Sequence, residues 1–263
     1  MPELPEVETV VRSLRPQITG AVIRSASFRS KLVTRGEFSV VARALAGSTI
    51  QAVQRTGKHI FLILEHGFIH VHLGMTGKLL WNGVESPYTR AVLETDRGRL
   101  VYDDIRQFGR VNYYETMPKH LKALGQDALL MAFEDFFAGL RQHRVFIKAL
   151  LLNQNVVSGV GNIYADEMLF QARIHPKARA DRLSRPRALR LYNAMQEVLS
   201  RAIAHRGSSI SDYVDSDGAQ GEFQRLHLVY GKTGEPCTVC GRPVRRIVVA
   251  QRGTHYCPVC QRH

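Results

Sequence analysis

Residues 237–260 read CTVCGRPVRRIVVAQRGTHYCPVC and contain all four cysteines of the chain. Two Cys-x-x-Cys pairs are separated by sixteen residues, a spacing typical of a four-thiolate zinc site. Residues 242–250 and 251–256 are expected to form a short hairpin between them. Two disulfides are the alternative, but they require an oxidising compartment that no sequence feature indicates. The stretch predicts one structural Zn2+ bound by Cys237, Cys240, Cys257 and Cys260.

Positive charge is unusually abundant, on this hairpin and along the whole chain. The 263 residues include 36 Lys+Arg and 23 Asp+Glu, for a net charge of +13, and 44% of them are hydrophobic. The hydrophobic fraction is sufficient for a buried core, and the charge excess favours a polyanionic partner, most commonly nucleic acid. Arg245, Arg246 and Arg252 are expected to present charge to phosphate on the hairpin. The charges are spread through patterned sequence, which excludes a basic tail.

No segment indicates a membrane or secreted protein. Apolar runs, such as residues 60–64, are too short to span a bilayer. The start, MPELPEVETV, lacks the basic and apolar regions of a secretory signal. We therefore expect a cytoplasmic protein that associates with the nucleoid by binding DNA.

The hydrophobic pattern changes once, near Pro118, and indicates an α+β, multidomain chain. Apolar residues recur at helical spacing from Leu4 to Leu14, and Pro16 is expected to end this helix. Strands are predicted at 22–28, 51–64 and 68–73, followed by a hairpin of 91–95 and 99–102. Helices are predicted near 134–141, 145–153, 163–172 and 186–205. The expected domains are residues 1–120, mostly β, residues 121–228, mostly helical, and residues 229–263, the zinc finger.

Residues 152–170, LNQNVVSGVGNIYADEMLF, combine two helical stretches with a short glycine-containing turn. The second stretch begins near Asn162, where free backbone N–H groups could receive a phosphate. Such a pair of helices also occurs purely for packing, so the residues alone leave both interpretations open.

The N-terminus offers a candidate nucleophile. Pro2 follows the initiator methionine, and a small residue at this position normally permits removal of that methionine. The exposed secondary amine could attack an aldehydic sugar carbon and form an iminium ion, with Glu3 and Glu6 as candidate acid or base groups. The alternative is a processed terminus without a catalytic role.

Several motifs together resemble the bacterial formamidopyrimidine-DNA glycosylase family, in family order and from the first residue to the last. They are MPELPEVETV, Thr56-Gly57-Lys58, HLGMTGKL at 72–79, IRQFGR at 105–110, GVGNIYADE at 159–167 and the cysteine-containing region 229–261. The resemblance implies an N-terminal β-sandwich with a leading helix, a helix–two-turns–helix domain and a zinc-finger hairpin. It also implies a monomeric repair enzyme that binds double-stranded DNA, excises oxidised purines and cleaves the abasic strand.

The resemblance assigns the catalytic roles residue by residue. Pro2 is expected to be the Schiff-base nucleophile and Glu3 the acid that helps to open the sugar. Lys58 matches a lysine credited with proton donation in β-elimination, and Arg252 matches the proton donor for δ-elimination. These roles suit a reaction in which the damaged nucleotide is flipped out of the duplex.

The DNA-binding roles come from the same resemblance. Met75, Arg106 and Phe108 match the three side chains that fill the gap left by the flipped nucleotide, with Arg106 bonded to the orphaned cytosine. Asn162 matches a phosphate-contacting asparagine, and Lys148 a DNA-contacting lysine. Tyr88 stands at another DNA-contacting position.

The chain departs from the family pattern at a few positions that bear on lesion preference. Many members have histidines where this chain has Tyr88 and Arg90, and a lysine where it has Asn155. Asp104-Ile105-Arg106-Gln107 replaces Asp-Pro-Arg-Arg, and Glu222 replaces an aromatic or amide residue.

Two other functions remain as alternatives. The related endonuclease VIII branch acts on oxidised pyrimidines, but it usually begins Pro-Glu-Gly-Pro-Glu rather than Pro-Glu-Leu-Pro-Glu. A non-catalytic DNA-binding zinc protein on the same scaffold would not require Pro2, Glu3 and Lys58. Cleavage of an abasic duplex distinguishes the enzyme from the binding protein.

Overall fold

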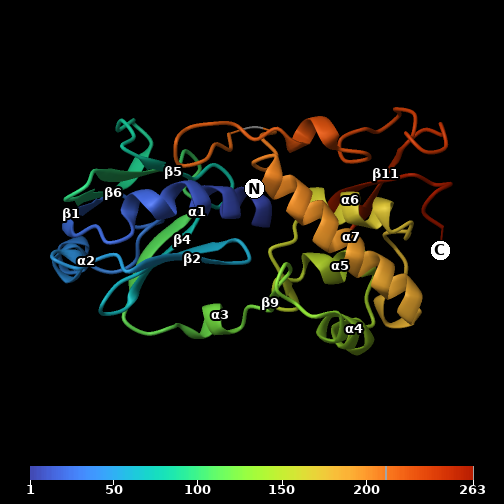
Figure 1. Cartoon of the computed structure of the whole chain (residues 1–263), viewed down its shortest axis with the longest axis horizontal. Coiled ribbons are helices and arrows are strands. Elements are labelled where there is room, and N and C mark those ends of the chain that lie inside the picture. Colours follow the sequence, from blue (N-terminus) through green and yellow to red (C-terminus); the bar gives the residue numbers. More distant parts are fainter. Residues whose placement is uncertain (211, 263) are drawn as a thin grey trace. The chain divides into compact units, whose positions relative to one another are not determined.

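The computed structural model describes residues 1–210 and 212–262, which form two compact units (Figure 1). Unit 1 comprises residues 1–122 and 205–224, and unit 2 comprises residues 123–204 and the chain from 225 onward. This grouping differs from the expected domains at 205–224, a segment that returns to the first unit. Over the described part of the chain, no helix is long and apolar enough to cross a membrane.

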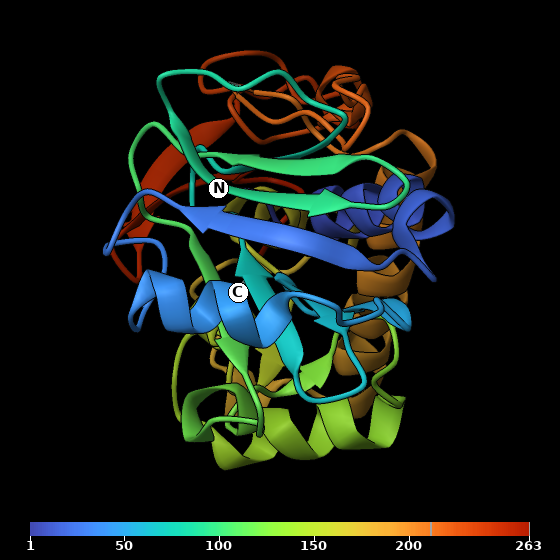
Figure 2. The same cartoon turned by 90° about the vertical axis from the view of Figure 1, so that its left-hand side faces the viewer.

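Unit 1 is a sandwich of two antiparallel four-stranded sheets, as expected for the α+β fold. One sheet has the order β1-β6-β7-β5 and the other β2-β3-β4-β8. Figure 2 faces this unit and shows β1, in blue, beside the green β6–β7 hairpin. The strands are β1 (Ile23–Phe28), β2 (Ala52–Thr56), β3 (His59–Ile63), β4 (Phe68–His72), β5 (Lys78–Trp81), β6 (Thr89–Thr95), β7 (Arg99–Asp103) and β8 (Arg110–Tyr114).

Helix α1 (Leu4–Ile18) packs against β2 and contributes its apolar face to the core of the sandwich. The prediction that Pro16 ends this helix is wrong. Ile18 is fully buried in the core, and its packing outweighs the backbone hydrogen bond that proline cannot donate. Two shorter helices, α2 (Phe38–Leu45) and α3 (Lys119–Lys122), complete the unit.

The single strand predicted over 51–64 is in fact two strands, β2 and β3. Gly57 has a φ of +55°, which turns the chain sharply just before Lys58. Apolar periodicity continues across this turn, so it could not reveal the break. The predicted hairpin at 91–102 is confirmed by β6 and β7.

Unit 2 contains four main helices and a hairpin close to the predicted positions. Helix α6 packs against α5, α7 and β12, and a small apolar cluster around Phe170 and Val229 lies beneath the hairpin. The elements are α4 (Phe133–Gln142), α5 (Ile147–Leu152), α6 (Asn162–Gln171), α7 (Arg185–Ala204), β9 (Gln126–Asp127), β10 (Val157–Ser158), β11 (Arg245–Val249), β12 (Arg252–Tyr256) and the short 3-10 helix Ala180–Arg182. A second 3-10 helix, Phe223–Leu226, begins in unit 1 and ends in unit 2.

Candidate active site and metal centre

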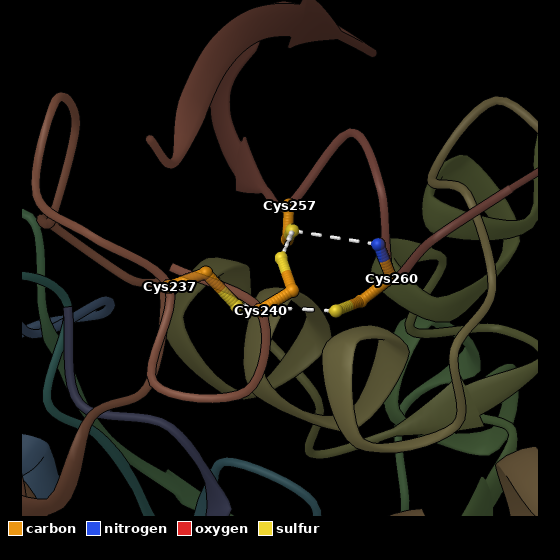
Figure 3. Close-up of side chains that lie close together, drawn as sticks. All are labelled: Cys237, Cys240, Cys257 and Cys260. Carbon is orange, nitrogen blue, oxygen red and sulfur yellow. Dashed lines mark hydrogen bonds between the residues drawn. The ribbon is translucent and has the colours of Figure 1, made fainter. Parts of the chain in front are cut away.

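The four cysteines converge at the base of the β11–β12 hairpin (Figure 3). Their Sγ atoms all lie within 4.8 Å of one another, with Cys240–Cys257 at 3.4 Å and Cys237–Cys260 at 3.9 Å. A tetrahedral Zn2+ with Zn–S bonds of about 2.3 Å separates its sulfurs by about 3.8 Å. All four are free cysteines, so the donor set fits one zinc ion rather than two disulfides. Four protein ligands leave no open position, which makes the site structural.

The carboxylates of the N-terminal segment are buried at the start of α1. Glu3 and Glu6 are 2% and 1% exposed, and together they form a capping box. The backbone N–H of Glu3 donates to Glu6 Oε2 at 2.7 Å. This arrangement fixes the backbone directly after Pro2, which is itself buried.

The other carboxylate oxygen of Glu6 binds the segment 205–224. Glu6 Oε1 accepts the backbone N–H of Ser208 at 2.7 Å, and the Tyr213 hydroxyl donates to the Glu6 carbonyl at 3.1 Å. Gly207 has a φ of +78°, and a Cβ there would lie 2.6 Å from Glu6 Oε1. Only glycine allows this close approach. Glu222, expected to alter lesion preference, is exposed at the other end of the segment.

Lys58 occupies the turn between β2 and β3 and is only 4% exposed. Arg55 supports this turn, since its Nε donates to Glu8 Oε2 at 2.7 Å and its Nη1 donates to the Gly57 carbonyl at 3.0 Å. Burial alone would raise the pKa of Glu8, but hydrogen bonds from Arg55 and Arg12 hold that pKa below its usual value. Sequence reasoning missed Arg55 and Glu8, because an Arg–Glu pair 47 residues apart leaves no local pattern.

The amine at the start of the chain lies among these groups. Burial is the main cause that lowers the pKa of the Met1 ammonium from 8.0, and the cations Lys58 and Arg106 lower it further. Glu3 and Glu6 act in the opposite direction. With Met1 in place, the nitrogen of Pro2 belongs to an amide and cannot be a nucleophile. An amine in this environment is biased toward its neutral, nucleophilic form.

Three exposed side chains project from two loops that we call the gap-filling loops, residues 74–76 and 104–109. Met75 is 41% exposed and Phe108 53% exposed, unusual values for large apolar residues near a core. The guanidinium of Arg106 lies 3.4 Å from Met75 Sδ and stacks over Phe108, with its carbon 4.6 Å from the ring centroid. The structure therefore brings the three predicted residues together.

A buried carboxylate, which sequence reasoning missed, holds the two loops together. Asp104 is fully buried, and its carboxylate accepts the Thr76 hydroxyl at 2.6 Å and the Gly109 N–H at 2.8 Å. Thr76 Oγ1 in turn accepts the Arg106 N–H at 3.1 Å. The backbone of Asp104 also bonds to Tyr88, which is 46% exposed, at 3.0 Å. The Asp104 carboxylate thus links Thr76 of the first loop to Gly109 of the second.

Histidines form a separate cluster on strands β3 and β4. His59 Nδ1 lies 2.8 Å from His70 Nε2, and the His59 ring also lies 4.9 Å from that of His72, centroid to centroid. Burial is the main cause that lowers their pKa values to about 2, about 3 and about 4, respectively, and neighbouring positive charges contribute. With these pKa values the three histidines are neutral at pH 7. Within the described residues, the four cysteines are the only group of three or more His, Cys, Asp or Glu side chains close enough together to hold a metal ion.

Unit 2 contains the other three predicted residues. Arg252 is exposed and directly follows the hairpin turn, and Asn162 is the first residue of α6. Lys148 is fully buried and forms an ion pair with Asp166, Nζ to Oδ1 2.6 Å. This placement does not support the expected contact between Lys148 and DNA, because the ammonium is directed into the unit.

A zinc-finger hairpin, a two-helix motif with a glycine turn and a β-sandwich in which Pro2 is buried before α1 are together typical of a DNA-repair class of protein. Sequence models of this class match three parts of the chain. The formamidopyrimidine-DNA glycosylase N-terminal domain matches residues 1–111, the H2TH domain of the same enzymes matches 124–214, and the zinc finger found in FPG and IleRS matches 234–262. The chain belongs to the formamidopyrimidine-DNA glycosylase family.

Individual relatives resemble it over their whole length. The formamidopyrimidine-DNA glycosylase of Solibacter usitatus is 51% identical over 100% of both chains, and that of Thermus thermophilus is 45% identical over 99% of this chain and 98% of its own. The crystal structure of a Thermus thermophilus protein of this family superimposes with a TM-score of 0.89 at 43% identity, covering 99% and 98%. A Lactococcus lactis enzyme in complex with DNA containing an abasic site gives 0.91 at 35% identity, covering 99% and 100%.

Proposed function

We propose that this chain is a base-excision repair enzyme that removes oxidised purines from duplex DNA and cleaves the resulting abasic strand by β,δ-elimination. The observation that carries the proposal is the burial of Pro2, Glu3 and Lys58 in one unit, beside the chain's N-terminal amine. The family is one of glycosylases with abasic-site lyase activity. A variant of the Lactococcus lactis relative has been crystallised with DNA containing Fapy-dG.

After removal of Met1, the Pro2 nitrogen attacks C1′ of the damaged nucleotide, and the bond between C1′ and the base breaks with its electron pair leaving on the base. Glu3 donates the proton that helps to open the sugar ring. Ring opening produces an iminium ion between Pro2 and C1′. The positive nitrogen withdraws electrons from C2′ and makes its proton acidic.

Loss of the C2′ proton starts strand cleavage. The electron pair of that C–H bond forms a C2′–C3′ double bond and expels the 3′-phosphate, which is β-elimination. Lys58 supplies a proton in this step and neutralises developing phosphate charge. Loss of a C4′ proton then expels the 5′-phosphate in δ-elimination, with Arg252 as proton donor.

DNA is held by both units in this proposal. Met75 and Phe108 occupy the gap left by the flipped nucleotide, and Arg106 donates hydrogen bonds to the orphaned cytosine. Asn162 and the arginines of the hairpin contact phosphates. The enzyme acts as a monomer and associates with the nucleoid through these contacts.

Borohydride trapping tests the nucleophile. Reduction of the iminium should give a covalent protein–DNA adduct that peptide mapping places on residue 2. Glu3→Gln should lose base excision by about 100-fold or more while retaining cleavage of a preformed abasic site. An adduct at Lys58, or full activity of protein that retains Met1, would show that Pro2 is not the nucleophile.

A lesion panel tests the substrate class. Duplexes that contain 8-oxoguanine, a formamidopyrimidine or an oxidised pyrimidine should be compared under single-turnover conditions. Faster excision of the two purine lesions is expected. Preference for the pyrimidine would instead favour an enzyme of the endonuclease VIII type.

A further inference from the structure

Lys148 is buried in the interior of unit 2 and is not a surface cation. Its side chain is 0% exposed, and so is that of its partner Asp166. The ammonium also donates to Thr254 Oγ1 at 2.8 Å and approaches the Gly253 carbonyl at 3.4 Å. A lysine ammonium has three protons, and these three acceptors can take all of them. No N–H group of Lys148 is left for a phosphate.

Asp166 binds the same strand with its second oxygen. Asp166 Oδ2 accepts the backbone N–H of His255 at 2.8 Å and lies 3.1 Å from His255 Nδ1. Asn162, at the start of the same helix, donates from Nδ2 to the Gly253 carbonyl at 3.0 Å. Helices α5 and α6 therefore contact three consecutive residues of β12, Gly253 to His255.

The residue that precedes these three is Arg252, and one contact reaches it directly. The Thr254 hydroxyl donates to the Arg252 carbonyl at 3.0 Å while its oxygen accepts from Lys148. A continuous chain of hydrogen bonds therefore runs from the buried ammonium through one hydroxyl to the backbone of Arg252. Each hydrogen bond polarises the next, because a hydroxyl that accepts from a cation becomes a better donor.

Arg252 needs such support because the hairpin offers little of its own. It follows a two-residue turn in which Ala250 and Gln251 have φ values of +49° and +59°. Type I′ turns require positive φ at both central residues, a conformation that non-glycine residues adopt at a cost. Arg252 itself is exposed, so packing does not fix its position.

From these contacts we infer that Lys148, Asp166 and Thr254 are positioning residues that place Arg252 for its step of the reaction. The inference rests on the proposed role of Arg252 as the proton donor in δ-elimination. Disturbing the hydrogen-bond chain should slow the second strand cut, while the steps that depend on Pro2, Glu3 and Lys58 continue. The product mixture then shifts from δ- toward β-elimination product.

Thr254→Val is the sharpest variant, because valine keeps the shape of threonine and removes only the hydroxyl. On a preformed abasic duplex, we expect the rate ratio of δ- to β-elimination to fall about three- to tenfold. Borohydride trapping at Pro2 and bound zinc should stay at wild-type levels. Thr254→Ser, which restores the hydroxyl, should restore the ratio.

Lys148→Met tests the ammonium, and it lowers stability because it removes the cation that faces the buried Asp166 carboxylate. The double variant Lys148→Met/Asp166→Leu removes both charges and should fold, yet show the same shift toward β product. Glu167→Gln is the matched control, since Glu167 binds the N–H groups of Leu228, Val229 and Tyr230 rather than β12. It should leave the ratio unchanged.

The outcomes separate this inference from the proposed function. An unaltered ratio in zinc-loaded Thr254→Val, or an equal loss of both steps, would overturn the positioning role. Absence of any δ product from the wild-type protein would instead overturn the proposed chemistry of Arg252. A change in ratio caused equally by Glu167→Gln would show that general loosening of the zinc finger is responsible.

Discussion

The gap-filling loops of unit 1 and the β11–β12 hairpin of unit 2 both present exposed side chains from short turns, but they are supported differently. The gap-filling loops stand on a two-sheet core and are joined by hydrogen bonds to Asp104. The hairpin stands on a small apolar cluster, a metal site and the buried Lys148–Asp166 pair. A large core tolerates the loss of one contact locally, whereas a small one transmits the loss to the whole element.

Zinc removal should produce the largest difference between the two regions. Chelation, or Cys240→Ser, should disorder the hairpin because metal binding supplies much of its folding free energy. We expect δ-elimination to be lost and DNA affinity to fall about tenfold or more, since the hairpin arginines lose their support. Metal analysis, DNA-binding titration and product ratios measure this.

Unit 1 should retain its fold in the same experiment, which serves as the control. Thermal unfolding of the sandwich should be little changed after chelation. Fully active protein without bound zinc would contradict the structural role of the metal.

Acidification should destabilise unit 1 more than unit 2, because burial lowers the pKa values of three histidines in unit 1 and lowers that of His227 in unit 2 to about 4. The pKa values of His59, His70 and His72 are lowered to about 2, 3 and 4, so the unfolded chain binds more protons than the folded one below pH 6.5. The unfolding free energy is therefore highest above pH 6.5 and decreases as the pH falls toward 4. Each histidine can contribute up to about 1.4 kcal/mol per pH unit to the decline in unfolding free energy.

Denaturant titrations between pH 7 and 4.5 measure that slope. His70→Phe removes one of the three groups and should make the slope shallower. An identical slope in this variant would show that other groups cause the pH dependence.

Opposite-base choice should depend on Arg106. Lesions opposite cytosine should be excised faster than lesions opposite adenine, because the guanidinium donates hydrogen bonds that cytosine accepts. Arg106→Ala should reduce this preference by about 5- to 150-fold, the range expected for 1–3 kcal/mol of discrimination. Single-turnover rates on the two duplexes provide the ratio, and an unchanged preference would refute the assignment.

Asp104→Asn should have a smaller effect on the same ratio. Thr76 Oγ1 accepts from Arg106, so its hydroxyl proton points to Asp104, and Gly109 donates there too. An asparagine amide group would oppose one of these donors, with a cost of about 1–3 kcal/mol in stability. We expect the preference for cytosine to fall only a few-fold, and Thr76→Ser, which keeps the hydroxyl, to behave as wild type.

The sequence predicted those features that depend on local spacing. The two Cys-x-x-Cys pairs and the helical periodicity of α1 and α7 were sufficient to place the zinc site and the main helices, and the structure confirms these elements. The environment of Lys148 could not be predicted, because its partner Thr254 lies 106 residues away. Burial of a charge depends on tertiary contacts, and hydrophobic periodicity does not register them.

Asp104 illustrates a second limit. Its neighbours Arg106 and Phe108 were identified through their family motif, which emphasises side chains that touch DNA. Asp104 acts by accepting hydrogen bonds from Thr76 and Gly109, and no pattern in the sequence indicates these bonds. Only the three-dimensional arrangement shows that two separate loops share one acceptor.

The return of residues 205–224 to unit 1 has a consequence for synthesis of the protein. Ser208, which binds Glu6, follows Lys122, the end of the first part of unit 1, by 86 residues. At about 5–20 residues per second, a ribosome needs about 4–17 s to add them. During that interval the nascent chain contains α1 but not Ser208, whose backbone N–H binds Glu6 Oε1 in the folded protein. Pro2, the proposed nucleophile, is thus made first, and its surroundings are completed only after most of unit 2 has been translated.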